Sequence, residues 1–248
     1  MMLQTSRLSM DQCKTCPIGA SAICARCDSA EMRTLESVKF YRRFQAGQTI
    51  VYAGDRMDFV ASIVSGVATL NLNMEDGRRQ MVGLLLPADF IGRPGRTVAA
   101  FDLMATTDML MCCFRRKPFE DLLLAMPHLN QRLLEMTLDE LDAARDWMLL
   151  LGRKTAREKV ATLLIMVMRR TTTRSPEPPG DLQDFEVPLS RVEMADFLGM
   201  TEETVSRQMS SLRRDGVIGL SGIRRVQVAD LPQLVEVAGD DADGGLVA

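Results

Sequence analysis

A single long amphipathic helix is the feature that most restricts how this chain can fold. Residues 129–151, LNQRLLEMTLDELDAARDWMLLL, contain no Gly or Pro, and apolar residues recur there at helical spacing. The apolar stripe consists of Leu134, Leu138, Leu141, Ala144, Met148 and Leu151. At 1.5 Å per residue the helix would span about 34 Å, more than most helices in globular proteins. The sequence patterns before and after it differ, so the helix separates two modules.

Two structures are compatible with such a stripe. It can be the buried face of an ordinary core helix, or the interface at which two copies of the chain pair as a coiled coil. The intervening positions are charged, which keeps the opposite face in water: Glu135, Asp139, Glu140, Asp142, Arg145 and Asp146. The flanking modules are needed to choose between the two.

The composition sets broad limits on location and chemistry. A chain of 248 residues with 46% apolar residues has room for two domains. The N-terminus lacks the apolar core of a signal peptide, and no run approaches 18 apolar residues, so we expect a cytoplasmic protein without membrane contact. Its six cysteines would stay reduced there, which favours metal or redox chemistry over disulfides. The net charge of −3 argues against wholesale nonspecific nucleic-acid binding but allows a local basic surface.

Four cysteines near the N-terminus carry the strongest chemical pattern. They follow the spacing Cys13-x2-Cys16-x7-Cys24-x2-Cys27. Thiolates three positions apart can bind one metal centre from a tight turn, and a third can return after a short loop. The pattern is compatible with a structural zinc site, an iron–sulfur cluster or unligated redox thiols. Spacing alone does not separate zinc from iron, because both accept four sulfurs.

The next segment has the pattern of an all-β domain. From Glu31 to about Phe119, short apolar runs alternate with turn residues, and Asp76-Gly77 between two such runs predicts a hairpin. Strands at this spacing are typical of a barrel or jelly roll. Cys112 and Cys113 lie in the last predicted strand. Adjacent strand residues face opposite sides, so only one of the two can face a given site.

The C-terminal segment predicts a winged helix-turn-helix. After Gly152 comes a second amphipathic helix and then a polar, Pro-rich loop. Ser190 with Glu193 forms a capping box for a helix that ends near Gly199. Thr201 caps the next helix, which runs to about Arg214, and a two-stranded wing follows.

Within this module the second helix has an outward face that suits base reading. We expect six apolar residues to point inwards: Met194, Ala195, Leu198, Val205, Met209 and Leu212. The outward residues Glu203, Ser206, Arg207 and Ser210 can bond to base edges in the major groove. Arginines beside them can meet phosphates: Arg213, Arg214, Arg224 and Arg225. A winged helix used for protein contact is the alternative.

Together these features resemble the CRP/FNR family of transcription regulators over residues 13–237. The segment FLGMTEETVSRQMSSLRRDGVI resembles the family pattern LG-T-ETxSR, and MPHLNQRLLEMTLDELDAARDWMLLLGRKTAREKVA resembles the dimerisation helix and the helix after it. The resemblance implies an α+β fold with an N-terminal β-roll of the cyclic-nucleotide-binding, jelly-roll type. We expect a cysteine-rich segment at 1–30, the β-roll at 31–127, the dimerisation helix at 128–152, the DNA-binding domain at 153–237 and a disordered acidic tail at 238–248.

The cysteines resemble the oxygen-sensing FNR branch of this family, in particular its alphaproteobacterial members. Those members share the Cx2Cx7C spacing of Cys13, Cys16 and Cys24, and ATTDMLMC matches the approach to the branch's fourth ligand, which places that role on Cys112. The resemblance implies one [4Fe-4S] cluster per subunit on these four residues. Cys27 is an extra thiol, so sets in which it replaces Cys112 or Cys24 remain open.

The resemblance also implies the function and the partners. We expect a homodimeric, oxygen-responsive regulator that binds TTGAT-like palindromic DNA when its cluster is intact, controls genes for low-oxygen growth and contacts RNA polymerase. The stretch IGRPGRTVAAFDLMA lacks the glutamate of the cyclic-nucleotide subfamily, so we expect no cyclic nucleotide. One rival keeps the DNA module but senses through zinc or a thiol redox pair. A cupin-like metalloenzyme is a distant rival, because the single histidine, His128, lies outside the strands. A DNA reader behind the long helix favours the dimer interface over the core-helix interpretation.

Overall fold

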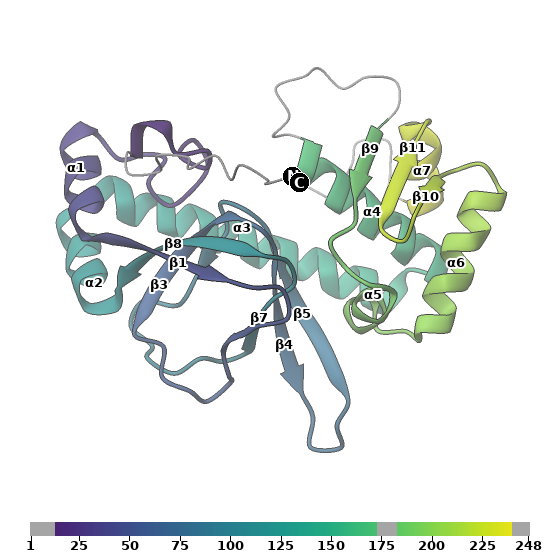
Figure 1. Ribbon diagram of the computed structural model, residues 1–248, viewed down its shortest axis with the longest axis horizontal. Coiled ribbons are helices and arrows are strands. Elements are labelled where there is room, and N and C mark those ends of the chain that lie inside the picture. The colour runs from purple at the N-terminus through teal and green to yellow at the C-terminus, as the bar shows by residue number, and fades with distance from the viewer. Residues whose placement is uncertain (1–12, 173–182, 240–248) are drawn as a thin grey trace, which may run out of the picture. The chain divides into compact units, whose positions relative to one another are not determined.

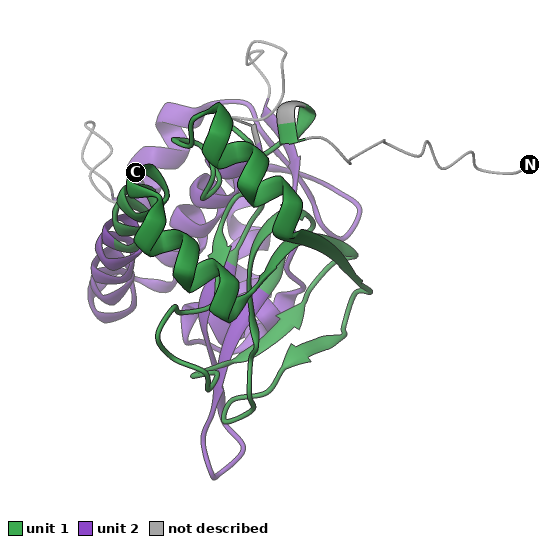
Figure 2. Ribbon diagram, turned by 90° about the vertical axis from the view of Figure 1, so that its left-hand side faces the viewer, with its two compact units in different colours: residues 1–68, 85–137 green, residues 69–84, 138–248 purple. Residues whose placement is uncertain are grey.

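The protein divides into two compact units that share one helix. The computed structural model describes residues 13–172 and 183–239. Unit 1 comprises residues 1–68 and 85–137, and unit 2 comprises residues 69–84 and 138–248 (Figure 2). The first twelve residues, most of the predicted Pro-rich loop and the acidic tail from residue 240 lie outside the described residues. Among the described helices, none is both long and apolar enough to cross a membrane.

Unit 1 contains one complete sheet of the predicted β-roll and two strands of a second sheet. One antiparallel sheet has the order β1-β8-β3-β6, and its strands lie side by side (Figure 1). Its strands are β1 (Lys39–Phe44), β3 (Phe59–Ser65), β6 (Phe90–Ile91) and β8 (Met109–Arg115). A second pairing joins β2 (Thr49–Val51) to β7 (Asp102–Ala105). Alternation along β8 buries Met109, Met111 and Cys113 on one face, as a half-covered strand requires.

The structure departs from the predicted strands at the start of this unit. Residues expected to begin the β-rich region form α1 (Ser29–Val38). Asp28 caps this helix: its side chain accepts from the amides of Ala30 and Glu31, and the Glu31 carboxylate accepts from the Asp28 amide. Leu35, on the apolar side of this helix, is buried. A second helix, α2 (Arg116–Ala125), follows β8 directly.

The long helix is present as predicted. It is α3 (Pro127–Arg153), and it begins in unit 1 and ends in unit 2. Leu129 in its first turn is fully buried. The predicted stripe is largely exposed in the single chain, with Leu134 60% exposed and Met148 67% exposed. The core-helix interpretation of the stripe is therefore wrong for an isolated subunit.

Unit 2 contains the predicted winged helix-turn-helix, which confirms the α+β fold class. Its helices are α4 (Ala156–Thr172), α5 (Arg191–Leu198), α6 (Glu202–Arg214) and α7 (Leu231–Ala238). The predicted two-stranded wing consists of β10 (Gly219–Ser221) and β11 (Arg225–Val228), and a strand that was not predicted, β9 (Gln183–Glu186), extends it to a three-stranded sheet in the order β10-β11-β9. All six residues predicted to point inwards from α5 and α6 are buried.

Two contacts hold the first helix of the motif within unit 2. The Trp147 and Phe197 rings stack with centroids 4.0 Å apart. The hairpin of β4 (Ala68–Asn73) and β5 (Arg79–Leu85) reaches the same helix, where Arg79 pairs with Asp196 and Gln80 donates to the Asp196 carbonyl. The hairpin turn is the predicted one, with Gly77 at φ 86°.

Candidate metal centre and DNA-reading helix

The cysteine segment is a compact coil of successive turns. It starts with a single 3-10 turn, η1 (Cys13–Thr15), and backbone hydrogen bonds then link Cys16 to Cys13, Gly19 to Cys16 and Cys27 to Cys24. Gly19 permits a close approach, because a Cβ there would lie 3.3 Å from the Cys16 carbonyl oxygen. These turns return the chain on itself, as the predicted metal-binding loop requires.

Apolar packing brings the segment onto the outer face of the β-roll. Ile18 and Ala22 are buried against Val64 and Ala88, and three thiols border this cluster: Cys16, Cys24 and Cys112. Ile23 packs into a second cluster around Phe114 and Leu129, which Cys24, Cys27 and Cys112 also border. The loop therefore meets β8 at Cys112.

Burial and mutual proximity raise the pKa of two of these thiols. Burial, followed by repulsion from Cys16 and Cys13, raises the pKa of Cys24 to about 11. Burial, followed by repulsion from Cys13, Cys24 and Cys16, raises the pKa of Cys112 to about 12. Cys13, Cys16, Cys24 and Cys112 are thus close enough to sense one another's charge. The thiols of Cys24 and Cys112 are therefore protonated in the metal-free protein at neutral pH, and a bound metal would have to displace their protons to use them as ligands.

The two remaining cysteines have different surroundings. Burial, Glu31 and Cys24 raise the pKa of Cys27 to about 12, so a carboxylate is its strongest charged neighbour. Cys113 is fully buried on the other face of β8, where its thiol lies 3.9 Å from the Met111 carbonyl oxygen. The alternation of β8 thus separates Cys113 from Cys112, as the sequence predicted.

The donor set is suited to a thiolate-bound metal cofactor. Four sulfurs on one zinc ion at 2.3 Å lie about 3.8 Å from one another. In the described part of the chain, no three thiols lie mutually within 4.8 Å. A cluster of several metal atoms separates its cysteine sulfurs more widely than a single ion does. Four cysteine thiolates are the ligands of a structural zinc ion as well as of a [4Fe-4S] cluster, so the donor set fits a thiolate-bound metal centre of either kind.

A buried lysine adjoins the first of these thiols. Lys39, the first residue of β1, places Nζ 3.3 Å from Cys13 Sγ and 3.5 Å from Glu36 Oε1. Burial would lower the pKa of Lys39, but its hydrogen bonds and the charges around it raise that pKa above the usual value. The Cys13 amide donates to the same Glu36 oxygen at 2.9 Å. Cys13 is therefore held through both its backbone and its side chain.

Three polar contacts connect the cysteine segment and α1 to the first turns of α3. Arg132 Nη2 donates to the Ser21 carbonyl oxygen at 2.7 Å. Arg26 Nε lies 2.7 Å from Glu135 Oε2. His128 Nδ1 lies 2.9 Å from Glu31 Oε2. With Ile23 packed beside Leu129, these contacts attach the segment to the helix that carries the apolar stripe.

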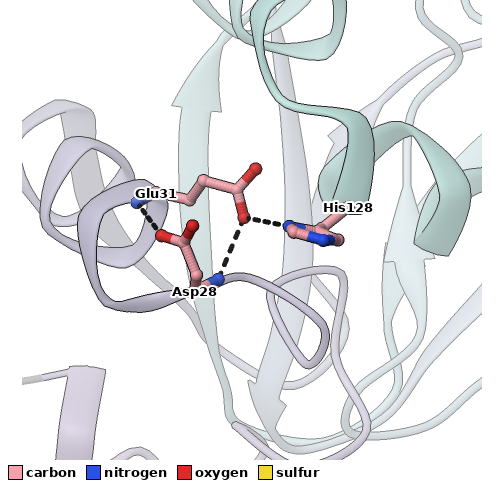
Figure 3. A group of neighbouring side chains, drawn as sticks. All are labelled: Asp28, Glu31 and His128. Carbon is pink, nitrogen blue, oxygen red and sulfur yellow. Dashed lines mark hydrogen bonds and ion pairs between the residues drawn. The ribbon is translucent and has the colours of Figure 1, made fainter.

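The hydrogen bond between His128 and Glu31 gives the single histidine a structural role that needs no bound ion. Figure 3 shows Glu31 joined both to the Asp28 amide and to His128. Ligand atoms of Asp28, Glu31 and His128 lie within 4.8 Å of one another, a spacing that a metal ion could use. Their hydrogen bonds already cap α1 and attach it to α3.

In unit 2, α6 presents the predicted reading face. Thr201 caps the helix, its side chain accepting from the Thr204 amide at 3.2 Å. Glu203, Arg207 and Ser210 are exposed, and Ser206 is half-buried. These side chains leave the first turns of α6, the part of a recognition helix that meets base edges.

The predicted phosphate contacts differ in how well their charges are already offset. Arg213 and Arg214 are exposed at the end of α6. Arg225 instead lies 2.9 Å from Asp184, across the paired strands β11 and β9. Because this ion pair already offsets its charge, Arg213 is better placed than Arg225 to meet DNA, whereas Arg214 has a looser ion pair, 3.9 Å from Asp215.

A β-roll, a long helix with an exposed apolar stripe and a winged helix-turn-helix define a class of DNA-binding transcription regulators rather than enzymes. The model of the Crp-like helix-turn-helix domain matches residues 158–237, and that of the cyclic nucleotide-binding domain matches residues 41–125. The chain is 63% identical over 237 residues to the transcriptional activator protein FnrL of Cereibacter sphaeroides, covering 96% of both chains. It belongs to the CRP/FNR family, as its motifs predicted.

Two further relatives support the same assignment. The nitrogen fixation regulation protein FixK of Bradyrhizobium diazoefficiens is 36% identical, covering 84% of this chain and 86% of FixK. The solved structure of FixK2 from Bradyrhizobium japonicum superposes with a TM-score of 0.73 at 31% identity, covering 83% of this chain and 98% of that chain. The fold and its order along the chain are therefore those of this family.

Several residues at the site had no motif to reveal them. Lys39, Arg26 and Arg132 are ordinary surface-type residues in the sequence, and their partners in the fold are 26, 109 and 111 positions away. Only the fold brings them together. The pairing of β1, which begins at Lys39, with the strand of Cys112 is likewise known only from the fold.

The raised thiol pKa values predict how the metal-free protein responds to alkali. The folded state holds the protons of Cys24 and Cys112 more tightly than the unfolded state, so stability is present below pH 9 and is lost as the pH rises towards 11 to 12. We expect the melting temperature of metal-free wild type to fall more steeply between pH 9 and 11 than that of Cys112→Ser. The melting temperature of each protein at pH 7 is the reference for its own values at higher pH. Parallel curves would contradict the raised pKa of Cys112.

Proposed function

We propose that the protein is an oxygen-responsive transcriptional activator that works as a homodimer with one [4Fe-4S] cluster per subunit. The observation that carries this proposal is the convergence of Cys13, Cys16 and Cys24 on Cys112, at a loop fastened to α3. The printed name of the relative FnrL, a transcriptional activator protein, agrees with an activator role, and that of FixK agrees with a regulatory one. Its genes would be those of low-oxygen growth, and it would act in the cytoplasm without a cyclic nucleotide.

Residues of this chain would bind the cluster and would determine the shape of the cluster site. When bound, the cluster supplies a group that dioxygen attacks. The four thiolates hold it, three of them from a coil whose turns bring them together and one from a strand that fixes the fourth position. Ile18, Ala22 and Ile23 keep water from the inner side of the coil, since each is buried.

The exposed stripe of α3 supports the dimer. Burying large apolar side chains contributes about 1.5 to 3 kcal/mol each, so Leu134, Leu138, Leu141 and Met148 are sufficient to drive association once a second copy covers them. Asp139, Glu140 and Asp142 flank the stripe, and like charges from two subunits would keep the dimer marginal. A marginal dimer responds to small changes in the cysteine segment.

Dimerisation makes palindromic DNA the natural partner. Two recognition helices must lie about 34 Å apart to enter successive major grooves, and a dimer fixes that distance. Glu203, Ser206 and Arg207 would read each TTGAT-like half-site, with Ser210 beside them. Arg213 and Arg214 would neutralise phosphates. An activator bound there would contact RNA polymerase.

The ligand set predicts which cysteines the cluster needs. Purified without oxygen, wild type should contain about four iron and four sulfide per chain and absorb visible light. Cys112→Ser should lose both the iron and the binding of a palindromic site, because the fourth ligand is gone. Cys113→Ser and Cys27→Ser are matched controls that should retain both. Elemental analysis, the visible spectrum and an anaerobic gel-shift assay measure these quantities.

The same samples separate the rival assignments. A colourless wild type with one zinc per chain would refute the iron–sulfur centre and favour the zinc rival. A full iron content in Cys112→Ser together with its loss in Cys27→Ser would move the fourth ligand to Cys27. A metal-free wild type that binds DNA only when reduced would favour a thiol redox pair.

Arg207 should read a base rather than a phosphate. We expect Arg207→Ala to lose about 1 to 3 kcal/mol of binding free energy and to relax the preference at one base pair of each half-site. Arg213→Ala is the matched control, because removing a phosphate-binding charge weakens binding equally on all sequences and lowers the salt slope by about 1. Binding measured on single-base variants of the site distinguishes the two. Equal weakening by Arg207→Ala on every variant would contradict the assignment.

A further inference from the structure

Lys39 is a buried cation whose position the proposed function leaves unexplained. Only 7% of its side chain is exposed. Its ammonium lies 3.3 Å from Cys13 Sγ and 5.4 Å from the centre of the Tyr41 ring. Tyr41 pairs across the sheet with Cys112, so Lys39 and Tyr41 connect the loop ligand to the strand ligand.

Burying an ammonium group is costly unless nearby anions offset it. Glu36 at 3.5 Å is one such anion, but its side chain is 34% exposed and it also accepts from the Cys13 amide. A neutral thiol is a weak hydrogen-bond acceptor, whereas a thiolate is charged and accepts strongly. The place of Lys39 is therefore favourable when Cys13 is a thiolate.

A charge on Cys13 would act on the whole metal centre, because Cys13 is one of its four proposed ligands. Four thiolates give the metal centre a net negative charge, and hydrogen bonds to the sulfurs together with nearby charges set its reduction potential. A cation fixed on one ligand stabilises the more negative, reduced form.

We propose that Lys39 is a positioning residue of the metal centre, which donates a hydrogen bond to the Cys13 thiolate and thereby sets the centre's reduction potential and its retention of iron. This inference rests on the proposed function, because it requires a thiolate-bound cluster. It adds to that function the residue that sets how easily the cluster gives up an electron.

The test compares Lys39→Met with Lys39→Arg in the full-length protein, with Lys117→Met as a matched control. Met removes the charge with little change in length, Arg keeps the charge, and Lys117 is an exposed lysine on α2 paired with Asp121. Two quantities are measured without oxygen: the midpoint potential against a reduced viologen dye, which gives up one electron as the cluster gains one, and the rate of iron loss to a chelator.

We expect Lys39→Met to assemble the cluster with a midpoint potential more negative by about 59 mV or more, a tenfold change for a one-electron couple. Its iron should be lost several-fold faster. Lys39→Arg should restore most of both values, and Lys117→Met should match wild type. If Lys39→Met does not assemble, Lys39→Gln takes its place, because it keeps a neutral donor of similar reach.

Different results would refute the proposed function and the role of Lys39. A wild type without iron and sulfide refutes the proposed function itself. A wild type with a full cluster, combined with an unchanged potential and an unchanged rate of iron loss in Lys39→Met, refutes only the role of Lys39. Equal losses in Lys39→Met and Lys39→Arg would likewise refute it, since charge would then be irrelevant.

Discussion

The packing of the cysteine coil against β8 is the interaction on which the rest of unit 1 depends. Ile18, Ala22 and Ile23 are buried there, and full burial of one isoleucine contributes about 1.5 to 3 kcal/mol. This apolar contact holds the thiols in a place where their ionisation is unfavourable, which raises the pKa of Cys24 and Cys112. A metal that binds there would have to displace the protons of these thiols, and in the proposed function Lys39 would favour the resulting thiolates.

The coil is also attached to the helix that carries the apolar stripe. Arg132, Arg26 and Ile23 join it to the first turns of α3. In the proposed function, these contacts are the route by which a change at the cysteines would act on the helix. A differential free energy of about 5.5 kcal/mol is enough to move a two-state equilibrium from 1:99 to 99:1. Contacts of a few buried side chains and ion pairs, such as those between the coil and α3, have free energies of that order. A change confined to these contacts is therefore enough for the proposed switch.

Local patterns in the sequence predicted much of the fold. The long helix, the Ser190 and Thr201 caps and the wing follow from spacing and capping, which act within a few residues. The helix α1 was missed, because its capping box at Asp28 and Glu31 stands beside a run that also suits a strand. Strand alternation predicted that Cys112 and Cys113 lie on opposite faces of β8, and the family resemblance predicted that Cys112 faces the cysteine coil. The contacts of Lys39 and Arg132 could not be predicted, since each depends on chain segments that only the tertiary fold brings together.

Sedimentation velocity of one anaerobic sample, before and after controlled addition of air, tests the central claim most directly. The visible absorbance of the same sample reports whether the metal centre is intact. The account predicts a dimer while the absorbance persists and a shift towards monomer in step with its loss. An unchanged sedimentation coefficient after complete loss of absorbance would contradict the link between the cysteine coil and the α3 interface.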